Sequence, residues 1–475
     1  MMEHESMPGI REDAYFQCLL CDQVLSHRAI AEHKSTYHSD LDVYGFMRYH
    51  QTDDLRSAFA EDLDRFERGQ YTGIKGSRTL ARMSALHLDD CVLFADDGNA
   101  EGDNPIHRSE VIAKTLGVRD VYIRDEGQNP TGSLKDYMVA AAVTLGMLDG
   151  ADAFTTVSSG NHAVALARYA ERVGRCANVF IPYSSSKAAL LESLPNVEVF
   201  RMTDGKDGSA CYEDVYEAHA KRTDAGYNAN ASNEFIYDLI QQACIDTALK
   251  LQGRAFPTHV LTGVGNGSYV GMLGKGFRLL ARDGIIPHVP RMVPVGMDGG
   301  FPLETCVGMQ RRHIFEYRDF RSGIEGIESA EGSIAIASYS MPHAVRAVRE
   351  TNGMTLGGMR NEDLADAYRL LMQDPCLLDA GAIPEPTGIM SLAAAIKHRG
   401  MFDPDDVLLL CFTGHAAKDE QEITHLLGAE GDDLVDRALS SRADIRIPPR
   451  SHIIAPDQDI SNILGENDGL YAIRS

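Results

Sequence analysis

The sequence contains no tryptophan, and all aromatic residues together make up 7% of its 475 residues. It lacks a run of about 18 apolar residues, the length that a membrane-spanning helix needs. Its first residues, Met1 to Glu12, lack the basic and then apolar order of a secretory signal. Basic residues are outnumbered, 45 against 69 acidic ones, which gives a net charge of −24. Because such a field repels nucleic acid and membrane surfaces, we expect a cytoplasmic protein with no nucleic-acid or membrane partner.

Hydrophobic residues make up 44% of the chain, which is ample for a large core in two to three structural units. The nine cysteines are mostly scattered through apolar segments, which is typical of reduced core residues in a reducing compartment. Only Cys18 and Cys21 are close enough in sequence to suggest a site.

From Gly102 onward, short apolar segments alternate with longer amphipathic ones. The alternation favours parallel α/β architecture. We expect strands at 121–124, 154–157, 178–181, 197–201, 259–262, 293–296 and 407–412, and helices at 55–67, 137–148, 163–173, 233–251 and 387–398. The continuous run Val407 to Phe412 suits a strand that is buried on both faces.

The first motif with chemical content is Asn129-Pro130-Thr131-Gly132-Ser133-Leu134-Lys135-Asp136. Pro130 and Gly132 predict a tight turn, and Ser133 can cap the helix that follows. Lys135 then lies in the first helical turn, where the positive end of the helix and apolar surroundings disfavour its ammonium form. A lysine with a lowered pKa is a competent amine for imine chemistry.

Three further loops each follow a predicted strand. The turn Ser158-Ser159-Gly160-Asn161-His162 opens a helix, and the free backbone N–H groups at a helix N-terminus suit a carboxylate. The loop Gly263-Val264-Gly265-Asn266-Gly267-Ser268 also opens a helix, and its glycines allow backbone amides to approach a phosphate. The segment Thr413 to Asp419 follows the strand 407–412, and sites in parallel sheets lie at such carboxyl ends.

The order of these four motifs resembles pyridoxal-5′-phosphate (PLP) enzymes of fold type II, the tryptophan-synthase-β-like family, and among them threonine synthase. The motif at Lys135 is similar to the threonine-synthase segment Asn-Pro-Thr-Gly-Ser-Phe-Lys-Asp. The segments Gly102 to Ile106 and Thr413 to Asp419 are similar to Gly-Asp-Thr-Pro-Leu and Thr-Gly-His-Gly-Leu-Lys-Asp. The resemblance covers about Gly102 to Lys418.

The resemblance implies two parallel-sheet α/β domains with the cofactor between them, and a homodimer. We expect a zinc-finger-like element at 12–40, the first part of the large PLP domain at 41–136, a small α/β domain at 137–230, the rest of the large domain at 231–430, and a C-terminal extension at 431–475.

The resemblance also implies residue roles. Lys135 would carry the cofactor as a Schiff base and later move the Cα proton. Asn161 would hold the cofactor's 3′-oxygen, and Gly263, Val264, Gly265, Asn266, Gly267 and Ser268 would cradle its phosphate. Thr413 would meet the pyridine nitrogen, and Ser158, Ser159, Gly160 and His162 would bind the substrate carboxylate. A neutral hydroxyl at Thr413 makes the ring a weaker electron sink, which suits elimination or replacement at Cβ or Cγ.

The predicted activity is therefore that of a PLP-dependent, threonine-synthase-like lyase or synthase acting on a small amino acid that bears a leaving group. The chain departs from threonine synthases after Asp136, where Tyr137-Met138 stands in place of their usual Arg-Gly. Its segment Ser158 to Ala163 looks more like serine/threonine ammonia-lyases. That reaction, or β-replacement like that of a cysteate or cysteine synthase, is the alternative. A zinc-finger regulator that uses a PLP fold as a sensor is a second alternative, which the retention of Lys135, Asn161 and Thr413 disfavours.

The N-terminal residues Cys18, Cys21, His33 and His38 approach the spacing of a Cys2His2 zinc finger. Thiolates and imidazoles at this spacing suit tetrahedral Zn²⁺, and four protein ligands would make the site structural. A chance cluster of surface histidines is the competing interpretation.

Overall fold

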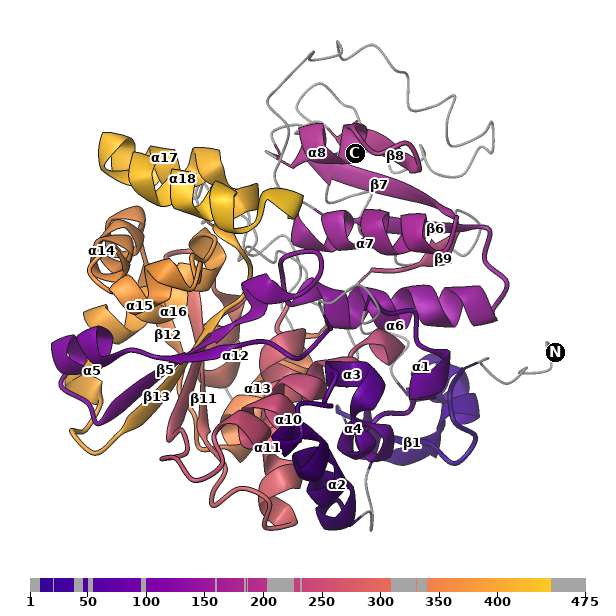
Figure 1. Cartoon of the computed structure of the whole chain (residues 1–475). Coiled ribbons are helices and arrows are strands. Elements are labelled where there is room, and N and C mark those ends of the chain that lie inside the picture. The colour runs from indigo at the N-terminus through magenta and orange to yellow at the C-terminus, as the bar shows by residue number, and fades with distance from the viewer. Residues whose placement is uncertain are drawn as a thin grey trace.

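The computed structural model describes most of the chain (Figure 1). The described residues are 9–19, 21–37, 46–49, 54–94, 100–158, 160–182, 185, 187–202, 226–230, 233–308, 330 and 340–445.

The largest sheet in the described part of the chain has six strands in the order β12-β11-β10-β13-β5-β4. Its strands are β4 (Ile106–Arg108), β5 (Asp120–Asp125), β10 (His259–Gly263), β11 (Arg291–Met297), β12 (Leu356–Met359) and β13 (Val407–Phe412). All neighbouring pairs are parallel except β4 with β5. The run predicted for burial on both faces is therefore the third strand from one edge and the fourth from the other.

Helices cover both faces of this sheet, and strand β13 shows why. Its side chains alternate between two cores: Leu408, Leu410 and Phe412 join one, while Val407, Leu409 and Cys411 join the other. The first core includes α5 (Glu110–Leu116), α14 (Asn361–Leu371) and α16 (Pro386–Lys397). The second includes α10 (Gln242–Lys250), α11 (Ser268–Arg282) and α13 (Met341–Glu350). The apolar run is thus explained by a strand whose two faces are both dry.

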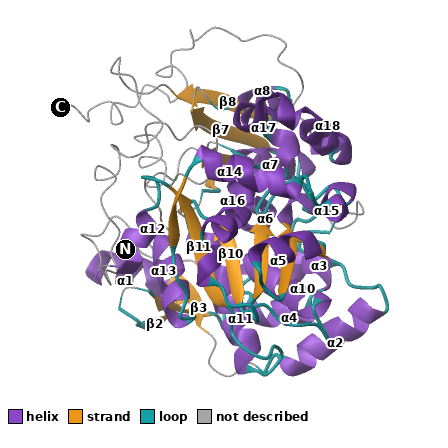
Figure 2. Ribbon diagram, turned by 90° about the vertical axis from the view of Figure 1, so that its left-hand side faces the viewer, coloured by secondary structure: helices purple, strands orange, loops and turns teal. Residues whose placement is uncertain are grey.

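A second, four-stranded parallel sheet has the order β8-β7-β6-β9. It comprises β6 (Ala153–Val157), β7 (Cys176–Pro182), β8 (Val197–Met202) and β9 (Tyr227–Asn228), with α6 (Lys135–Leu148), α7 (Asn161–Arg172) and α8 (Ala188–Glu192). In both Figure 1 and Figure 2 its strands β7 and β8 lie at the top, above the larger sheet. The prediction of an α/β fold built on two parallel sheets is confirmed.

The N-terminal residues form a small antiparallel sheet, β2-β1-β3, with one helix. Its elements are β1 (Tyr15–Cys18), β2 (Val24–Ser26), α1 (Ile30–Tyr37) and β3 (Phe46–Tyr49). In the described part of the chain, the other α-helices are α2 (Arg56–Glu67), α3 (Gly73–Gly76), α4 (Arg78–Met83), α12 (Pro302–Gly308), α15 (Pro375–Asp379), α17 (Glu420–Leu427) and α18 (Asp432–Ser441).

The long helix expected at 233–251 is interrupted. Two 3₁₀ turns, Glu234–Ile236 and Asp238–Gln241, precede α10. The side chain of Asn233 accepts a hydrogen bond from the Phe235 amide at 3.2 Å, and Asp238 accepts one from the Ala85 amide at 2.8 Å. These polar side chains bond to backbone groups locally and across the fold, so they favour turns over a continuous helix.

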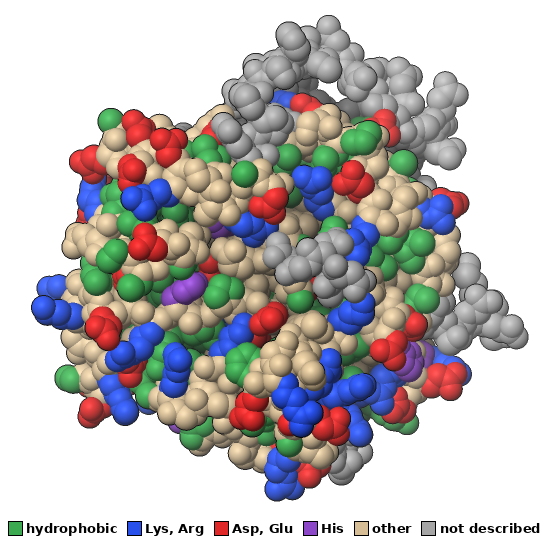
Figure 3. Space-filling model, in the orientation of Figure 1, with side chains coloured by type: hydrophobic (Ala, Val, Ile, Leu, Met, Phe, Trp, Pro, Cys, Tyr) green, Lys and Arg blue, Asp and Glu red, His purple; other side chains and the backbone are tan. Residues whose placement is uncertain are grey.

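Among the described residues, no helix combines the length and the apolar character needed to cross a bilayer. On the face shown in Figure 3, acidic and basic side chains are interspersed.

Candidate active site

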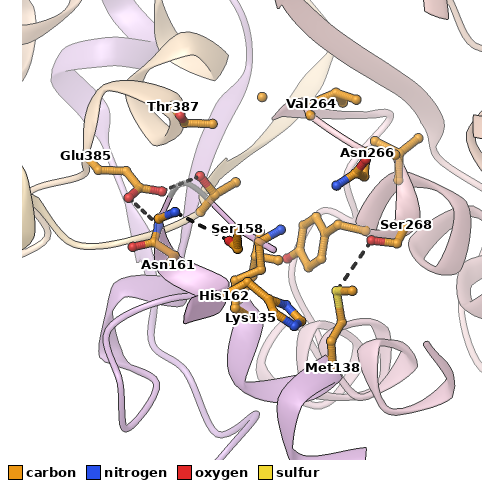
Figure 4. A pocket seen from close by; sticks show the side chains of 18 of the residues that line it. Lys135, Met138, Ser158, Asn161, His162, Val264, Asn266, Ser268, Glu385 and Thr387 are labelled. Atoms are coloured by element: carbon orange, nitrogen blue, oxygen red, sulfur yellow. Dashed lines mark hydrogen bonds between the residues drawn. The ribbon is translucent and has the colours of Figure 1, made fainter. Parts of the chain in front are cut away.

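A cavity of about 130 Å³ is lined by loops that follow strands of both parallel sheets. It brings together Lys135, Ser158, Gly160, Asn161, His162, Thr413 and the whole loop from Gly263 to Ser268 (Figure 4). These are all of the residues predicted to hold the cofactor and substrate except Ser159, which lies outside the described residues. Four segments far apart in sequence therefore converge on one space.

Lys135 is the first residue of α6, and the turn before it is fixed from both sides. Gly132 has a φ of 80°, a left-handed conformation that glycine adopts without strain. Asp136 accepts a hydrogen bond from the Thr131 amide at 2.7 Å, and the Thr131 hydroxyl also donates to this carboxylate. Burial lowers the pKa of Lys135, while the nearby carboxylate of Glu385 acts in the opposite direction. The lysine is thus positioned, and biased toward its neutral amine.

The segment Thr413 to Lys418 holds the lysine motif by backbone contacts. The Leu134 amide donates to the Thr413 carbonyl at 2.9 Å, and the His415 amide donates to the Gly132 carbonyl at 2.9 Å. The buried Lys418 ammonium donates to the same Gly132 carbonyl at 2.8 Å. Two motifs that lie 286 positions apart in sequence, measured from Gly132 to Lys418, are therefore one structural unit.

The turn at the start of α7 presents Ser158, Gly160 and Asn161 to the cavity, beside His162. The His162 imidazole is buried, and its Nε2 donates to the Ala229 carbonyl at 2.5 Å. Burial, together with the charge of Lys135, lowers the pKa of His162 to about 4. His162 is therefore neutral at pH 7, and one of its ring nitrogens is already committed to the protein.

The glycine loop joins β10 to α11, so its amides lie at the positive end of a helix of 15 residues. A side chain at Gly263 would place its Cβ 2.2 Å from the Thr387 carbonyl oxygen, and Gly267 has a φ of 91°. Both positions therefore require glycine. The Val264 amide donates to the Val295 carbonyl at 3.0 Å, so this amide continues the sheet rather than facing a ligand.

Glu385 is a site residue that the sequence analysis missed. It precedes α16, and its buried carboxylate accepts from the Asn161 side-chain amide and, at 3.4 Å, from the Thr413 hydroxyl. Burial raises the pKa of Glu385, the charge of Asp419 adds to this, and Lys418 and Lys187 oppose it. The only local signal was a glutamate followed by Pro386 at the start of an apolar helix, which by itself also fits an ordinary helix start.

A second buried carboxylate, Glu126, lies behind the cavity. It accepts hydrogen bonds from Asn104 at 2.7 Å, Asn129 at 2.8 Å, Tyr137 at 2.9 Å and Tyr269 at 2.6 Å. Arg124 compensates its charge, with Nε 2.6 Å from Glu126. Since Asn129 begins the lysine motif and Tyr269 lines the cavity, this network supports both walls of the site. Tyr137, the residue that departs from the threonine-synthase pattern, is part of it.

Of the four predicted metal ligands, the structure brings three together. The ligand atoms of Cys18, Cys21 and His33 all lie within 4.8 Å of one another. His38 lies outside the described residues, so its role remains a prediction from the sequence.

The burial of His415 is expected to make the stability of the protein depend on pH. Its pKa is lowered from 6.5 to about 3, first by burial and then by the charge of Arg442. Between these values the unfolded chain binds a proton that the folded protein excludes, so the free energy of unfolding falls as pH falls below 6.5. The contribution is at most about 1.4 kcal/mol per pH unit.

We expect His415→Gln to reduce the dependence of the free energy of unfolding on pH, measured by urea unfolding between about pH 7 and about pH 5. Replacement of the exposed His87 by glutamine should leave this dependence unchanged. Parallel slopes for wild type and His415→Gln would contradict the assignment.

Comparison with known proteins gives the class to which this fold and site belong. The family model for pyridoxal-phosphate dependent enzymes matches residues 98–414, so the chain belongs to that family. Solved structures share the fold. The T.th. threonine deaminase matches with a TM-score of 0.52 and 22% identity, over 66% of this chain and 92% of that one. Diaminopropionate ammonia lyase from Escherichia coli matches with a TM-score of 0.55 and 16% identity, over 70% and 88%.

Among curated proteins, the chain is similar to the threonine synthase of Methanocaldococcus jannaschii. The two are 26% identical over 324 residues, which cover 67% of this chain and 76% of the relative.

The cavity residues fit pyridoxal phosphate. The Lys135 amine, whose pKa is lowered, lines the cavity, which suits the cofactor's aldehyde. Helix α11 opens toward the cavity with its glycine loop, which suits a phosphate. The side-chain nitrogen of Asn161 carries two N–H groups and donates one of them to Glu385, so the other suits the cofactor's 3′-oxygen.

Proposed function

We propose that this enzyme is a threonine-synthase-like lyase or synthase that removes or replaces a leaving group at Cβ or Cγ of a small amino acid. The observation that carries the proposal is the convergence of Lys135, Asn161, the 263–268 loop and Thr413 on one cavity, in which the group at the end of β13 is a neutral hydroxyl. A carboxylate there would stabilise a protonated ring nitrogen, and a hydroxyl does so less.

Bound in this cavity, pyridoxal phosphate supplies an aldehyde for amines and a conjugated ring that withdraws electrons from the substrate's Cα. The protein's part is positional and electrostatic. The Lys135 amine would hold the cofactor through its aldehyde, and the same amine would take and return the proton at the substrate's Cα. Burial lowers the pKa of this amine, which favours its neutral, nucleophilic form.

The other residues orient the two ligands. The amides around Gly265 and Ser268 hold the phosphate at the start of α11. The turn Ser158 to His162 holds the substrate carboxylate at the start of α7, a helix of 12 residues. The Asn161 amide, which already donates to Glu385, would donate its other N–H to the 3′-oxygen. His162, neutral at pH 7, supplies a polar surface without adding a charge.

An ammonia-lyase or a β-replacement synthase is the second candidate, because Ser158 to Ala163 resembles the corresponding turn of serine/threonine ammonia-lyases. Both candidates use the same lysine and glycine loop, and they differ in the leaving group and in whether a nucleophile enters. A homodimer is expected from the resemblance to the fold type II family, and light scattering of the purified protein tests it.

A substrate panel tests the proposal. The holoenzyme is mixed with O-phosphohomoserine, O-phosphoserine, O-acetylserine, serine and threonine, and three products are followed: free phosphate or acetate, keto acid, and new amino acid. Threonine formed from O-phosphohomoserine supports the threonine-synthase-like assignment. Keto acid from serine or threonine supports the ammonia-lyase. Transamination without loss of any side-chain group would refute elimination and replacement together.

Glu385 offers a test of the site's electrostatics. Because its carboxylate raises the pKa of Lys135, Glu385→Gln is expected to lower that pKa further. The midpoint of cofactor attachment to the apo-protein, followed by visible absorbance against pH, should move to lower pH by up to about one unit. The exposed Glu362→Gln is the matched control and should leave the midpoint in place. A midpoint that moves to higher pH would show that Glu385 does not act on Lys135 as a negative charge.

A further inference from the structure

The N-terminal sheet holds two thiols and an imidazole in one small volume. Cys18 ends β1, Cys21 lies in the turn to β2, and His33 is on α1. In the turn, the Asp22 amide donates to the Cys18 carbonyl at 2.9 Å, and the Cys18 amide donates to the Gln23 carbonyl at 2.9 Å. Asp22 has a φ of 63°, a left-handed conformation in which aspartate is several-fold enriched. This tight turn brings both cysteines to the same side.

The separation of one pair of side chains matches that of two ligands on a tetrahedral metal ion. The Cys21 sulfur and the His33 Nε2 are 3.4 Å apart. A tetrahedral zinc with Zn–S of about 2.3 Å and Zn–N of about 2.0 Å separates such a pair by about 3.5 Å. The sulfur of Cys18 completes a group whose atoms all lie within 4.8 Å. Cys18 and His33 are buried and Cys21 is exposed, so an ion can enter from the solvent side.

The element is too small to be held by its own core. Its strands have four, three and four residues, and its helix has eight. Its apolar side chains, among them Phe16, Leu25 and Ile30, are part of the main core, so the element is held by packing on the body of the protein and by whatever its polar groups bind. We propose that Cys18, Cys21 and His33 bind a zinc ion, and that this ion holds the element against α13 and thereby steadies the glycine loop. Metal binding itself does not depend on which amino acid the enzyme uses.

The path from the element to the loop consists of short contacts. The ring of His33 packs edge-on against Phe46 of β3, with centroids 5.9 Å apart. The Phe46 carbonyl accepts a hydrogen bond at 2.9 Å from Nε2 of His343, which is buried on α13. At the N-terminus of α13, the Ser340 hydroxyl donates to the Asn266 carbonyl in the glycine loop at 2.7 Å.

Helix α13 is pressed closely against α11, the helix that the loop opens. A Cβ at Gly267 would lie 2.8 Å from the Cβ of Ala344, and one at Gly271 would lie 2.4 Å from the Cβ of His343. A Cβ at Gly274 would lie 2.6 Å from the Cβ of Ala347. Because the two helices are in close contact at these glycines, α11 and the loop must shift when α13 is displaced.

Metal content tests the site. Full-length protein, purified under reducing conditions with added zinc, is expected to hold about one zinc per chain by elemental mass spectrometry. Cys18→Ser, Cys21→Ser and His33→Gln should each lose it. Cys376→Ser, which removes an exposed thiol far from the group in sequence, should keep it. Wild-type protein without zinc, or ligand variants that retain it, would overturn the proposal.

Cobalt provides a measurement that does not depend on the folding of variants. Wild-type protein stripped of zinc and titrated with Co²⁺ should develop the intense visible bands of tetrahedral cobalt with a sulfur-to-metal band in the near ultraviolet. Zinc should abolish both. A weak, octahedral cobalt spectrum without the sulfur band would refute coordination by the cysteines.

The coupling to the glycine loop is tested by cofactor affinity. Removal of zinc, and separately Ser340→Ala, should each weaken the binding of pyridoxal phosphate to the apo-protein by roughly 2- to 30-fold. Ser340→Ala should retain its zinc, which separates loss of the contact from loss of the metal. Unchanged affinity in both cases would overturn the coupling.

Discussion

Replacing Lys135 by alanine is expected to abolish covalent retention of pyridoxal phosphate and to lower kcat by on the order of a thousandfold or more. The same amine holds the cofactor and moves the Cα proton, so one substitution removes both contributions. The fold should survive, because alanine has the highest helix propensity and Lys135 is the first residue of α6.

The measurement combines turnover with the visible band of the lysine-bound cofactor, which should disappear in Lys135→Ala. Lys114→Ala is the matched control: Lys114 is exposed on α5, and its loss should change neither quantity. Circular dichroism of the Lys135 variant checks that its helices remain. A variant that keeps its visible band after dialysis would show that another amine holds the cofactor.

The largest expected loss of stability follows from replacing Arg124 by methionine. Arg124 is fully buried and lies 2.6 Å from Glu126 and 2.7 Å from Asp246, both of which are also fully buried. Methionine fills much of the space and leaves two carboxylates without this cation. Removing one partner of a buried pair costs about 3–5 kcal/mol, since the remaining charge is uncompensated.

Urea unfolding measures this effect as a lower midpoint concentration of urea. The dependence of the free energy of unfolding on urea concentration should be the same as in the wild type, so that the shift in midpoint reports stability alone. Arg119→Met is the control, because the Arg119 side chain is 60% exposed and its contact with Asp120 is long, at 3.9 Å. Such a surface pair is worth no more than about 1 kcal/mol. Equal midpoints for the two variants would show that the Arg124 network does not stabilise the protein as described. Since the network also contacts Tyr269 and Asn129, a weaker hold on the cofactor should accompany the loss.

The sequence carried enough information to predict the elements that surround the site. The run Val407 to Phe412 was predicted as a strand with the bounds that the structure has, because burial on both faces leaves an unbroken apolar pattern. Lys135, the glycine loop and Thr413 were identifiable because each follows a turn or strand with its own local signature. Helix 233–251 was predicted wrongly as continuous, because the side chains of Asn233 and Asp238 bond to backbone groups that periodicity does not reveal.

What could not be predicted depends on contacts between distant residues. Glu385 reaches Asn161 across 224 positions of sequence, and Arg124 reaches Asp246 across 122. A single glutamate or arginine has no local pattern that distinguishes a buried partner from a solvated one. The hydrogen bond between His415 and Gly132 could not be predicted either, because neither motif contains a sequence pattern that indicates contact with the other.

That pairing has a consequence for recombination between relatives. Ser133 and Gly414 form an isolated antiparallel bridge, and Lys418 and His415 both bond to the carbonyl of Gly132. In the design of chimeras, the two segments must therefore be exchanged together, although they lie far apart in the sequence. A chimera that inherits one segment from another enzyme and keeps the other should set its lysine slightly out of place, while a chimera that exchanges both together keeps the geometry. A single crossover between residues 136 and 412 separates the two segments. Two crossovers within this range keep both segments from the same parent.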